Sequence, residues 1–304
     1  MRSVKRNSTV RGKNMLIDKV LEGFQKRGVE IYSITEMGEG YTESRIINPT
    51  SNPAAACHNS YSVAKVFTVT AIGMLYDAGL LTPDDKVYDI LGEHFPEDFD
   101  PNWKNVTLDN LMLHKIGLEK GYLDIDTENV LSYGTLDYLK YAFSRKLPNA
   151  VGVERVYSDA AYYILSRVVA KKSGEKMTDF LLPRLFNPLN FREVSWSVCP
   201  YGHAMGATGL YIRSEDMAKL GMVYLNGGTY EGQRIVSEEW VNLVLSRGYE
   251  LKPRTIRDME GYSKGGMYGQ MLYISKKENC VLAWHQHNKT GSSASKSVMD
   301  ELGL

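Results

Sequence analysis

The chain has 304 residues, of which 43% are hydrophobic and 24% charged, enough for one large domain or two interleaved ones with an ample core. Lysine plus arginine equals aspartate plus glutamate at 36 each, so no net field points to nucleic acid or to anionic lipid as a partner. No stretch approaches about 18 continuous apolar residues, so we expect no membrane-spanning helix.

Residues 1–14 read as a basic N-terminal tail, and no apolar segment of the kind found in secretory signals follows them. The three cysteines are widely spaced and odd in number, which suits a reducing compartment better than a disulfide framework. Together these features predict a cytoplasmic location.

Apolar periodicity predicts an amphipathic helix over 15–25. Two β-rich runs, 29–35 and 41–47, then predict a hairpin around a Met-Gly-Glu-Gly turn. An apolar helix follows from Ser62 to about Ala78. Helical periods then dominate up to about residue 189, in the segments 108–114, 135–143 and 160–172.

After residue 200 the pattern returns to mixed structure. It predicts a strand over 206–213, helices over 214–225 and 237–245, β runs over 266–275 and 280–287, and a short polar tail. Strands at both ends with helices between them predict a mixed α/β (α+β) fold. The expected division is an α/β sheet region from 15–80 plus 201–304, with an all-α region inserted at 81–200.

Residues 59–67, Asn-Ser-Tyr-Ser-Val-Ala-Lys-Val-Phe, join an irregular loop to the first apolar helix. Lys65 follows Ser62 at i+3, which places both side chains on one face, about 5–6 Å apart between Cβ atoms. A serine hydroxyl becomes a strong nucleophile when a base takes its proton, and a lysine can be that base only when neutral. Burial, the positive end of the helix dipole and a nearby cation all lower a lysine pKa. We therefore predict Ser62 as nucleophile and Lys65 as its base.

The S-x-x-K pattern is weak by itself, and it occurs again at 173–176 and 293–296. Both of those copies lie in polar, Gly- or Ser-rich surroundings with no apolar helix directly behind the serine. The alternative for Ser62 is an ordinary residue of a helix N-terminus, with Lys65 at the surface. The apolar neighbours of Lys65 argue against this, because they leave little of the helix for solvent.

A second pattern, Arg-Val-Tyr-Ser-Asp over 155–159, leads into the helix predicted at 160–172. The Tyr157 phenol could relay a proton between Ser62 and a leaving group, provided that a lysine holds it partly ionised or well oriented. The alternatives are that Tyr157, one of 20 tyrosines, is a packing aromatic and that Asp159 is a helix N-cap.

A third pattern, Ser-Lys-Gly-Gly over 263–266, is expected to open the penultimate β run. A cation and two glycines at a strand start allow the backbone to approach a ligand closely and an N–H to point at an oxyanion. Lys264, Gly265 and Gly266 are therefore candidate substrate-binding residues. The alternative is a flexible basic turn.

In this order, the three patterns resemble those of the serine β-lactamase and penicillin-binding-protein superfamily. The closest resemblance is to its class C branch, which includes β-lactamase-like esterases and peptidases. It extends from about residue 15 to 287 and implies an antiparallel sheet flanked by helices, the β-lactamase/transpeptidase-like fold. Further similar segments are L-M-L-H-K-I-G at 111–117 (with Ile116 where serine is usual), A-T-G-L at 207–210, S-E-D-M-A at 214–218, L-N-G-G at 225–228 and K-G-G-M-Y-G-Q at 264–270.

The resemblance implies a role for single residues. Ser62 would be acylated, Lys65 and Tyr157 would share the proton transfers, and Lys264 would set the local field. The oxyanion hole would consist of the backbone N–H groups of Ser62 and Met267. The same family chemistry implies no cofactor and no metal.

Asp159 departs from the family pattern, because many β-lactamases have asparagine there. That amide contacts the acylamino carbonyl of a substrate, and a carboxylate cannot donate a hydrogen bond unless it is protonated. Asp159 could pair with Lys65 or Lys264 instead. This puts β-lactam turnover in doubt and leaves the acylation chemistry intact.

Two other patterns imitate catalytic motifs. Lys-Thr-Gly at 289–291 has the form that the third motif takes in many relatives, but the 13 residues after it are too few for a hairpin and a terminal helix. Gly-Tyr-Ser-Lys-Gly at 261–265 matches the G-x-S-x-G nucleophile elbow, which requires an acid and then a histidine further along the chain. Here His285 and His287 both precede the only later aspartate, Asp300, so the order is wrong.

His285 and His287 are spaced i, i+2, on one face of a predicted strand. No nearby carboxylate or cysteine completes a zinc shell around them. We therefore expect a structural or substrate-rim role for these histidines rather than metal binding.

The sequence thus predicts a serine acyl hydrolase that forms an acyl-enzyme with a small ester or amide and binds neither nucleic acid nor membrane. Esterase or peptidase activity is favoured, given Asp159 and the lack of an export signal. One alternative is a true β-lactamase acting on a β-lactam-like substrate, or a D-Ala-D-Ala-type peptidase. A second is a penicillin-binding-type sensor or pseudo-enzyme without turnover. A third is a purely structural relative. The oligomeric state is left open.

Overall fold

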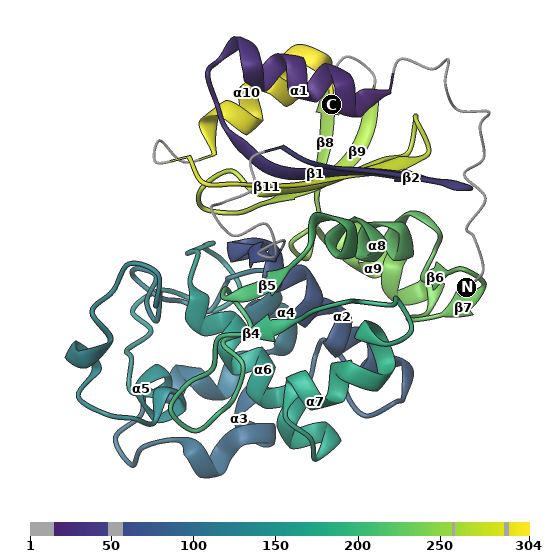
Figure 1. Ribbon diagram of the computed structural model, residues 1–304. Helices are drawn as coiled ribbons and strands as arrows, with labels where there is room; N and C mark the ends of the chain where they lie inside the picture. The colour runs from purple at the N-terminus through teal and green to yellow at the C-terminus, as the bar shows by residue number, and fades with distance from the viewer. Residues whose placement is uncertain (1–14, 48–56, 257–258, 289–291) are drawn as a thin grey trace.

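The computed structural model describes residues 15–47, 57–256, 259–288 and 292–304. The predicted basic tail (1–14) and the Lys-Thr-Gly pattern (289–291) lie outside these residues. A six-stranded sheet with helices on both faces lies against a second, mainly helical region (Figure 1). Among the described residues, no helix combines the length and the apolar character needed to cross a membrane.

The large sheet is antiparallel throughout and has the strand order β2-β1-β11-β10-β9-β8. Its N-terminal hairpin pairs directly with the last strand, with Ile34 opposite Trp284. The predicted antiparallel sheet flanked by helices and built from both ends of the chain is therefore confirmed. The strands are β1 (Ile31–Gly38), β2 (Tyr41–Ile46), β8 (Lys252–Ile256), β9 (Met259–Gly265), β10 (Met271–Ser275) and β11 (Cys280–Gln286).

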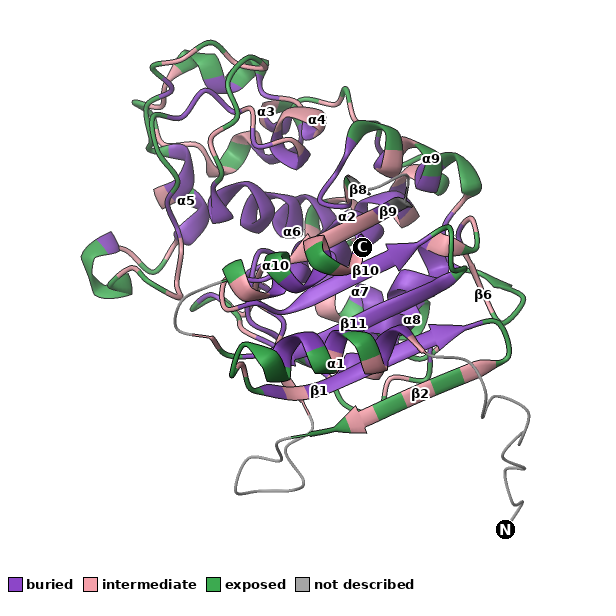
Figure 2. Ribbon diagram, turned by 90° about the horizontal axis from the view of Figure 1, so that it is seen from above, coloured by how far each residue is buried: buried purple, intermediate pink, exposed green. Residues whose placement is uncertain are grey.

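The central strands are buried on both faces, whereas the edge strand β2 alternates between half-buried and exposed residues (Figure 2). Successive side chains of a strand point to opposite faces. Ile34 accordingly packs in the core beneath α1 (Leu16–Lys26) and α10 (Ser293–Leu302), while the Thr35 hydroxyl on the other face lies 3.0 Å from that of Ser214.

Helix α8 (Ser214–Leu225) covers the second face of the sheet, with α9 (Glu238–Arg247) beside it (Figure 1). The helix approaches the strands closely at Gly221, where a Cβ atom would lie 2.5 Å from a methyl group of Val281. Any larger residue at this position would force the helix away from the sheet.

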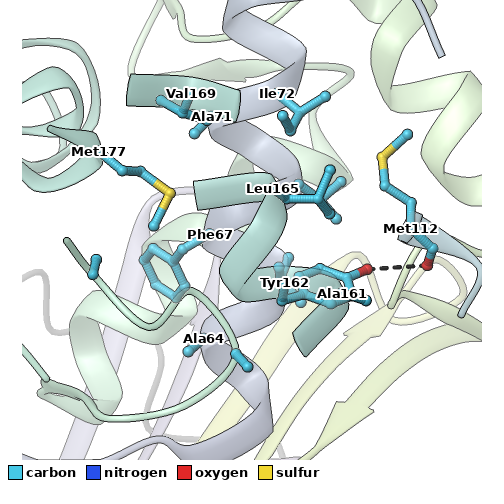
Figure 3. Packing of buried hydrophobic residues seen from close by; sticks show 14 of the residues in the cluster. Ala64, Phe67, Ala71, Ile72, Met112, Ala161, Tyr162, Leu165, Val169 and Met177 are labelled. Atoms are coloured by element: carbon cyan, nitrogen blue, oxygen red, sulfur yellow. Dashed lines mark hydrogen bonds between the residues drawn. The ribbon is translucent and has the colours of Figure 1, made fainter. Parts of the chain in front are cut away.

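The helical region is centred on α2 and α6, which pack against each other through Phe67, Leu165 and neighbouring apolar residues (Figure 3). The Tyr162 hydroxyl of α6 donates a 3.1 Å hydrogen bond to the carbonyl of Met112 and so ties α6 to α4. The helices here are α2 (Ala64–Asp77), α3 (Val87–Leu91), α4 (Leu108–Met112), α5 (Tyr138–Phe143), α6 (Asp159–Ser173) and α7 (Met177–Leu181).

Short strands complete the structure. In the range 81–200, expected to be all-α, helices joined by long loops are accompanied by the short strand β4. This strand joins β3 and β5 in a small sheet where the helical region meets the α/β region. The exact division into regions remains a prediction. The short strands are β3 (His58–Asn59), β4 (Ser195–Trp196), β5 (Leu210–Ile212), β6 (Thr229–Tyr230) and β7 (Gln233–Arg234).

The prediction that 263–266 opens a strand was wrong. Lys264 and Gly265 are the last two residues of β9, and β10 begins only at Met271. Residues 266–269 form a turn in which the Gly269 N–H donates to the Gly266 carbonyl. Gly269 has a φ of 98°, which a residue with a side chain rarely adopts, so the strand cannot run through this point.

His285 makes the stability of the sheet depend on pH. Its side chain is fully buried, and its ring centroid lies 5.7 Å from that of His58. Burial, aided by His58, lowers the pKa of His285 to about 3, below its unfolded value of about 6.5. The folded state therefore binds fewer protons than the unfolded chain between these values, and its stability falls as the pH drops below about 6.5.

We expect the free energy of unfolding to fall by about 2–3 kcal/mol on account of His285 alone between pH 7 and pH 4.5. Urea denaturation at the two pH values measures this loss. His285→Leu should remove that part of the acid sensitivity. An unchanged pH dependence in the variant would show that His285 does not cause it.

Candidate active site

Ser62 lies in a 3₁₀ turn, Tyr61–Val63, directly before α2. Three hydrogen bonds hold the residues at the start of this turn. The N–H and the hydroxyl of Ser60 both donate to the Leu210 carbonyl at 2.8 Å, and the Tyr61 N–H donates to Asn59 Oδ1 at 2.8 Å. Tyr61 has a φ of 46°, which a non-glycine residue adopts only when its surroundings hold it there. The Ser62 side chain is thus presented half-buried at the start of a fully packed helix.

Lys65 is completely buried one turn further along this face. Its ammonium group donates to three oxygen atoms: Asp159 Oδ1 at 2.7 Å, the Ala207 carbonyl at 3.0 Å and Ser62 Oγ at 3.2 Å. An ammonium group has three N–H bonds, so each one has a partner. This shell is what permits a charge at a site without water.

The predicted lowering of the Lys65 pKa was wrong. Burial is the largest single influence and acts in that direction, but Asp159, Tyr157 and Glu250 together outweigh it, and the pKa of Lys65 is raised. The lysine is therefore charged in the resting protein. It can donate a hydrogen bond to Ser62 but cannot accept the serine proton.

Tyr157 is the group placed to accept that proton. Its phenol oxygen lies 2.8 Å from Ser62 Oγ and 3.5 Å from Lys264 Nζ. The Lys65 and Lys264 ammonium groups lie 4.7 Å and 5.2 Å from its ring centroid, so both stabilise negative charge that develops on the ring. The side chain is 38% exposed, which leaves the phenol open to a substrate.

The turn after β9 lies beside Ser62. A Cβ atom at Gly266 would lie 2.9 Å from the carbonyl oxygen of Ser60, so only glycine allows the two backbones to meet here. The hydrogen bond that closes this turn runs from the Gly269 N–H to the Gly266 carbonyl and does not use the N–H of Met267. A role for Met267 and Ser62 as oxyanion donors agrees with this arrangement and remains a prediction.

Asp159 is the first residue of α6, and Ser158 occupies the N-cap position that had been the alternative for Asp159. Of the two lysines considered as its partner, the structure selects Lys65. Lys264 pairs instead with Glu250. As an ionised carboxylate, Asp159 offers a substrate only hydrogen-bond acceptors.

Three carboxylates form the one group in the described residues that has metal-like spacing: oxygen atoms of Asp124, Asp126 and Asp159 lie within 4.8 Å of one another. Each already accepts hydrogen bonds, Asp159 from Lys65, Asp126 from Thr208 and Asp124 from Thr127. This bonding indicates that the group holds the wall of the site together. Asp126 reaches the site through a long loop, and no motif in the sequence pointed to it.

Aromatic rings form a second wall. The rings of Tyr61 and Tyr268 pack edge to face with their centroids 5.0 Å apart. The ring of His287 stacks on that of Tyr268 with the centroids 4.2 Å apart. His287 therefore lies near Ser62, which is compatible with the substrate-rim role considered for the two histidines. His285, in contrast, is buried in the sheet.

His114 and Glu250 lie directly behind Tyr157 and were not predicted as site residues. Both are buried, and they contact each other through His114 Nε2 and Glu250 Oε1 at 2.7 Å. His114 could have been found from its place in the 111–117 segment. Glu250 carries no sequence signal.

Comparisons with known proteins identify the family of the chain. The family model described as Beta-lactamase matches residues 47–300. The chain belongs to the beta-lactamase family. Among curated relatives, 6-aminohexanoate-dimer hydrolase from Paenarthrobacter ureafaciens is 26% identical over 202 residues, which cover 63% of this chain and 51% of that protein. Penicillin-binding protein 4 from Amycolatopsis lactamdurans is 31% identical over 135 residues, 44% of this chain and 34% of that protein.

This beta-lactamase-family chain thus spans about half the length, or less, of these curated relatives. Among solved structures, that of D-amino acid amidase from Ochrobactrum anthropi SV3 aligns with a TM-score of 0.69 at 16% identity, covering 94% of this chain and 98% of that chain. The likeness shows a shared fold.

In this family member, the buried ion pair predicts a specific pattern of stability. Lys65→Met should lower the free energy of unfolding by about 3–5 kcal/mol, because it leaves Asp159 buried without its cation. Urea denaturation at pH 7 measures the change. The double variant Lys65→Met with Asp159→Leu should recover most of the loss, since no charge then stays buried.

Lys171→Met is the matched control, because Lys171 pairs with Glu93 at a half-exposed position. Removing an exposed pair changes stability by about 1 kcal/mol or less. A double variant that is no more stable than Lys65→Met alone would contradict the ion-pair explanation.

Proposed function

We propose that this protein is a serine hydrolase that cleaves a small ester or amide through a covalent acyl-enzyme. The observation that carries this proposal is the placement of Ser62 Oγ, 2.8 Å from the Tyr157 phenol oxygen and 3.2 Å from the Lys65 ammonium group. A nucleophile, a proton acceptor and a fixed positive charge thus meet at one half-buried point.

In the first step, Tyr157 in its phenolate form takes the Ser62 proton as Oγ bonds to the substrate carbonyl carbon. The N–H groups of Ser62 and Met267 hold the oxyanion that forms. The tetrahedral intermediate then breaks its bond to the leaving oxygen or nitrogen, which receives the proton from Tyr157. Between the two transfers Tyr157 is a neutral phenol. The Lys65 and Lys264 ammonium groups stabilise its phenolate form before the first transfer and after the second.

In the second step, a water molecule attacks the acyl-enzyme carbonyl and gives its proton to Tyr157. Cleavage of the bond between the carbonyl carbon and Ser62 Oγ returns that proton to the serine and releases the acid. The same three groups therefore serve both half-reactions, and no cofactor is needed.

The relatives named as a 6-aminohexanoate-dimer hydrolase and a D-amino acid amidase support hydrolysis of an amide or ester. Asp159 supports the same choice over β-lactam turnover, because its carboxylate is held by Lys65 and cannot donate to an acylamino carbonyl. A true β-lactamase or peptidase is the alternative. A penicillin-binding-type sensor, acylated without turnover, is a second one, favoured by the relative named Penicillin-binding protein 4.

A fluorophosphonate probe should add one label per protein molecule, at Ser62. The serine oxygen bonds to phosphorus, fluoride leaves, and the serine proton passes to Tyr157 and then to solvent. Intact-protein mass should show the adduct in the wild type and in Ser263→Ala, the serine of the G-x-S-x-G pattern, but not in Ser62→Ala. An adduct that persists in Ser62→Ala would disprove Ser62 as the nucleophile.

Tyr157→Phe should lower kcat for an activated ester by about 10²- to 10⁴-fold, because the proton acceptor is lost while the site keeps its shape. Multiple-turnover kinetics with p-nitrophenyl acetate measures this effect. Wild-type turnover well beyond one product per Ser62 supports the hydrolase. A single stoichiometric burst would instead establish the sensor.

A further inference from the structure

The pair formed by His114 and Glu250 has an unusual backbone. Both residues have a positive φ, 59° for His114 and 62° for Glu250. Residues with a full side chain rarely adopt this conformation, and it persists only where the surroundings over-determine it. Both residues are also almost completely buried. Two strained residues in direct contact, next to a proton acceptor, call for a functional explanation.

His114 holds Tyr157 from three directions. Its carbonyl accepts the Val156 N–H at 2.9 Å, and its Nδ1 atom accepts the Ser158 N–H at 3.2 Å. Its ring packs against the Tyr157 ring, with the centroids 4.4 Å apart. The residues on either side of the tyrosine and the tyrosine ring itself are therefore all fixed by one histidine.

These contacts also determine the tautomer of His114. Because Nδ1 accepts a hydrogen bond from Ser158, the ring proton lies on Nε2, which donates to Glu250 at 2.7 Å. Burial lowers the pKa of His114, and the neighbouring Glu250 opposes this only in part, so the ring is neutral at pH 7. Glu250 thus fixes which nitrogen carries the proton.

The other oxygen of Glu250 pairs with Lys264, whose Nζ atom lies 3.5 Å from the Tyr157 phenol oxygen. Burial acts to raise the pKa of Glu250, but Lys264 and His114 outweigh it and hold that pKa well below its usual range. The carboxylate is therefore ionised. His114, Glu250, Lys264 and Tyr157 thus form a closed ring of contacts.

We propose that His114 and Glu250 are positioning residues for proton transfer: His114 fixes the place of the Tyr157 phenol, and Glu250 fixes both His114 and the ammonium group of Lys264. Neither residue touches the substrate. The inference rests on the proposed function, in which Tyr157 accepts the Ser62 proton.

Three substitutions separate the contacts. His114→Asn keeps a residue that tolerates a positive φ and an amide oxygen for the Ser158 N–H, but it is too short to reach Glu250. His114→Gln is long enough to donate to Glu250. Glu250→Gln keeps the hydrogen-bonding capacity and removes the charge. His94→Asn, at a partly exposed histidine of the helical region, is the matched control.

The measurements are kcat and KM for p-nitrophenyl acetate, with rates divided by the concentration of Ser62 titrated by the fluorophosphonate. We expect His114→Asn and Glu250→Gln to lower kcat by about 10- to 100-fold with KM changed less than about threefold. His114→Gln should recover at least about a third of the kcat that His114→Asn loses, measured on a logarithmic scale. The control His94→Asn should have the kcat of the wild type. A loss that disappears after division by titrated sites would indicate misfolding alone and overturn the proposal.

The pH profile provides a readout that a purely structural role would not move. Removing the Glu250 charge leaves a stronger positive field around the phenol, so the acidic limb of kcat/KM should move to lower pH by about one unit in Glu250→Gln. The charged and titratable groups around Tyr157 are Arg155, Lys65, Lys264, Asp159, Glu250, His114 and Tyr162.

The possible failures are distinguishable. Wild-type kcat and an unmoved pH limb in both His114→Asn and Glu250→Gln would overturn this inference and leave the hydrolase proposal standing. An unreactive Ser62 in the wild type would instead reject the hydrolase. In that case, ¹⁵N spectra of the histidine rings decide the inference without turnover: it requires the Nε2–H tautomer for His114 and a shift of the Tyr157 ring signals in Glu250→Gln. The opposite tautomer, or unshifted signals, would overturn it.

Discussion

The arrangement of the site depends on one buried ammonium group, that of Lys65. Its three acceptors come from the turn before α2, from the first residue of α6 and from the chain leading into β5. A charge without water is tolerated only when every N–H has an oxygen partner, so these three segments have to meet at one point. The position of Ser62 relative to Asp159 follows from that requirement.

The charge balance around the nucleophile has the same origin. Lys65 with Asp159 and Lys264 with Glu250 are two lysine–carboxylate pairs, and the two ammonium groups lie 4.7 Å and 5.2 Å from the centroid of the Tyr157 ring. The lysines act on the phenol at short range, whereas the carboxylates lie behind them. A site that is nearly neutral overall can therefore still favour negative charge at one oxygen atom.

The sequence was sufficient for the sheet built from both ends, because β1, β10 and β11 are rich in apolar residues and β2 follows β1 after a short glycine-containing turn. It did not reveal β8 and β9, where Pro253, Gly261 and Gly265 interrupt the alternation of side chains. Ser62, Lys65 and Tyr157, whose side chains meet in the structure, could be predicted as a group because each stands in a short motif. The charge of Lys65 and the roles of Asp126 and Glu250 arise from contacts between distant segments, which no local pattern records.

The pairing of β1 with β11 has a consequence for the order in which the protein can fold. Ile31 is opposite Gln286, so the middle of the sheet closes only after nearly all of the described chain is present. Contacts between such distant residues carry a large loop-closure entropy and slow the folding rate. During synthesis, the helical region can collapse around α2 and α6 well before β9 and its turn reach Ser62. The site around Ser62 is thus completed only after β9 and the turn that follows it have been synthesised.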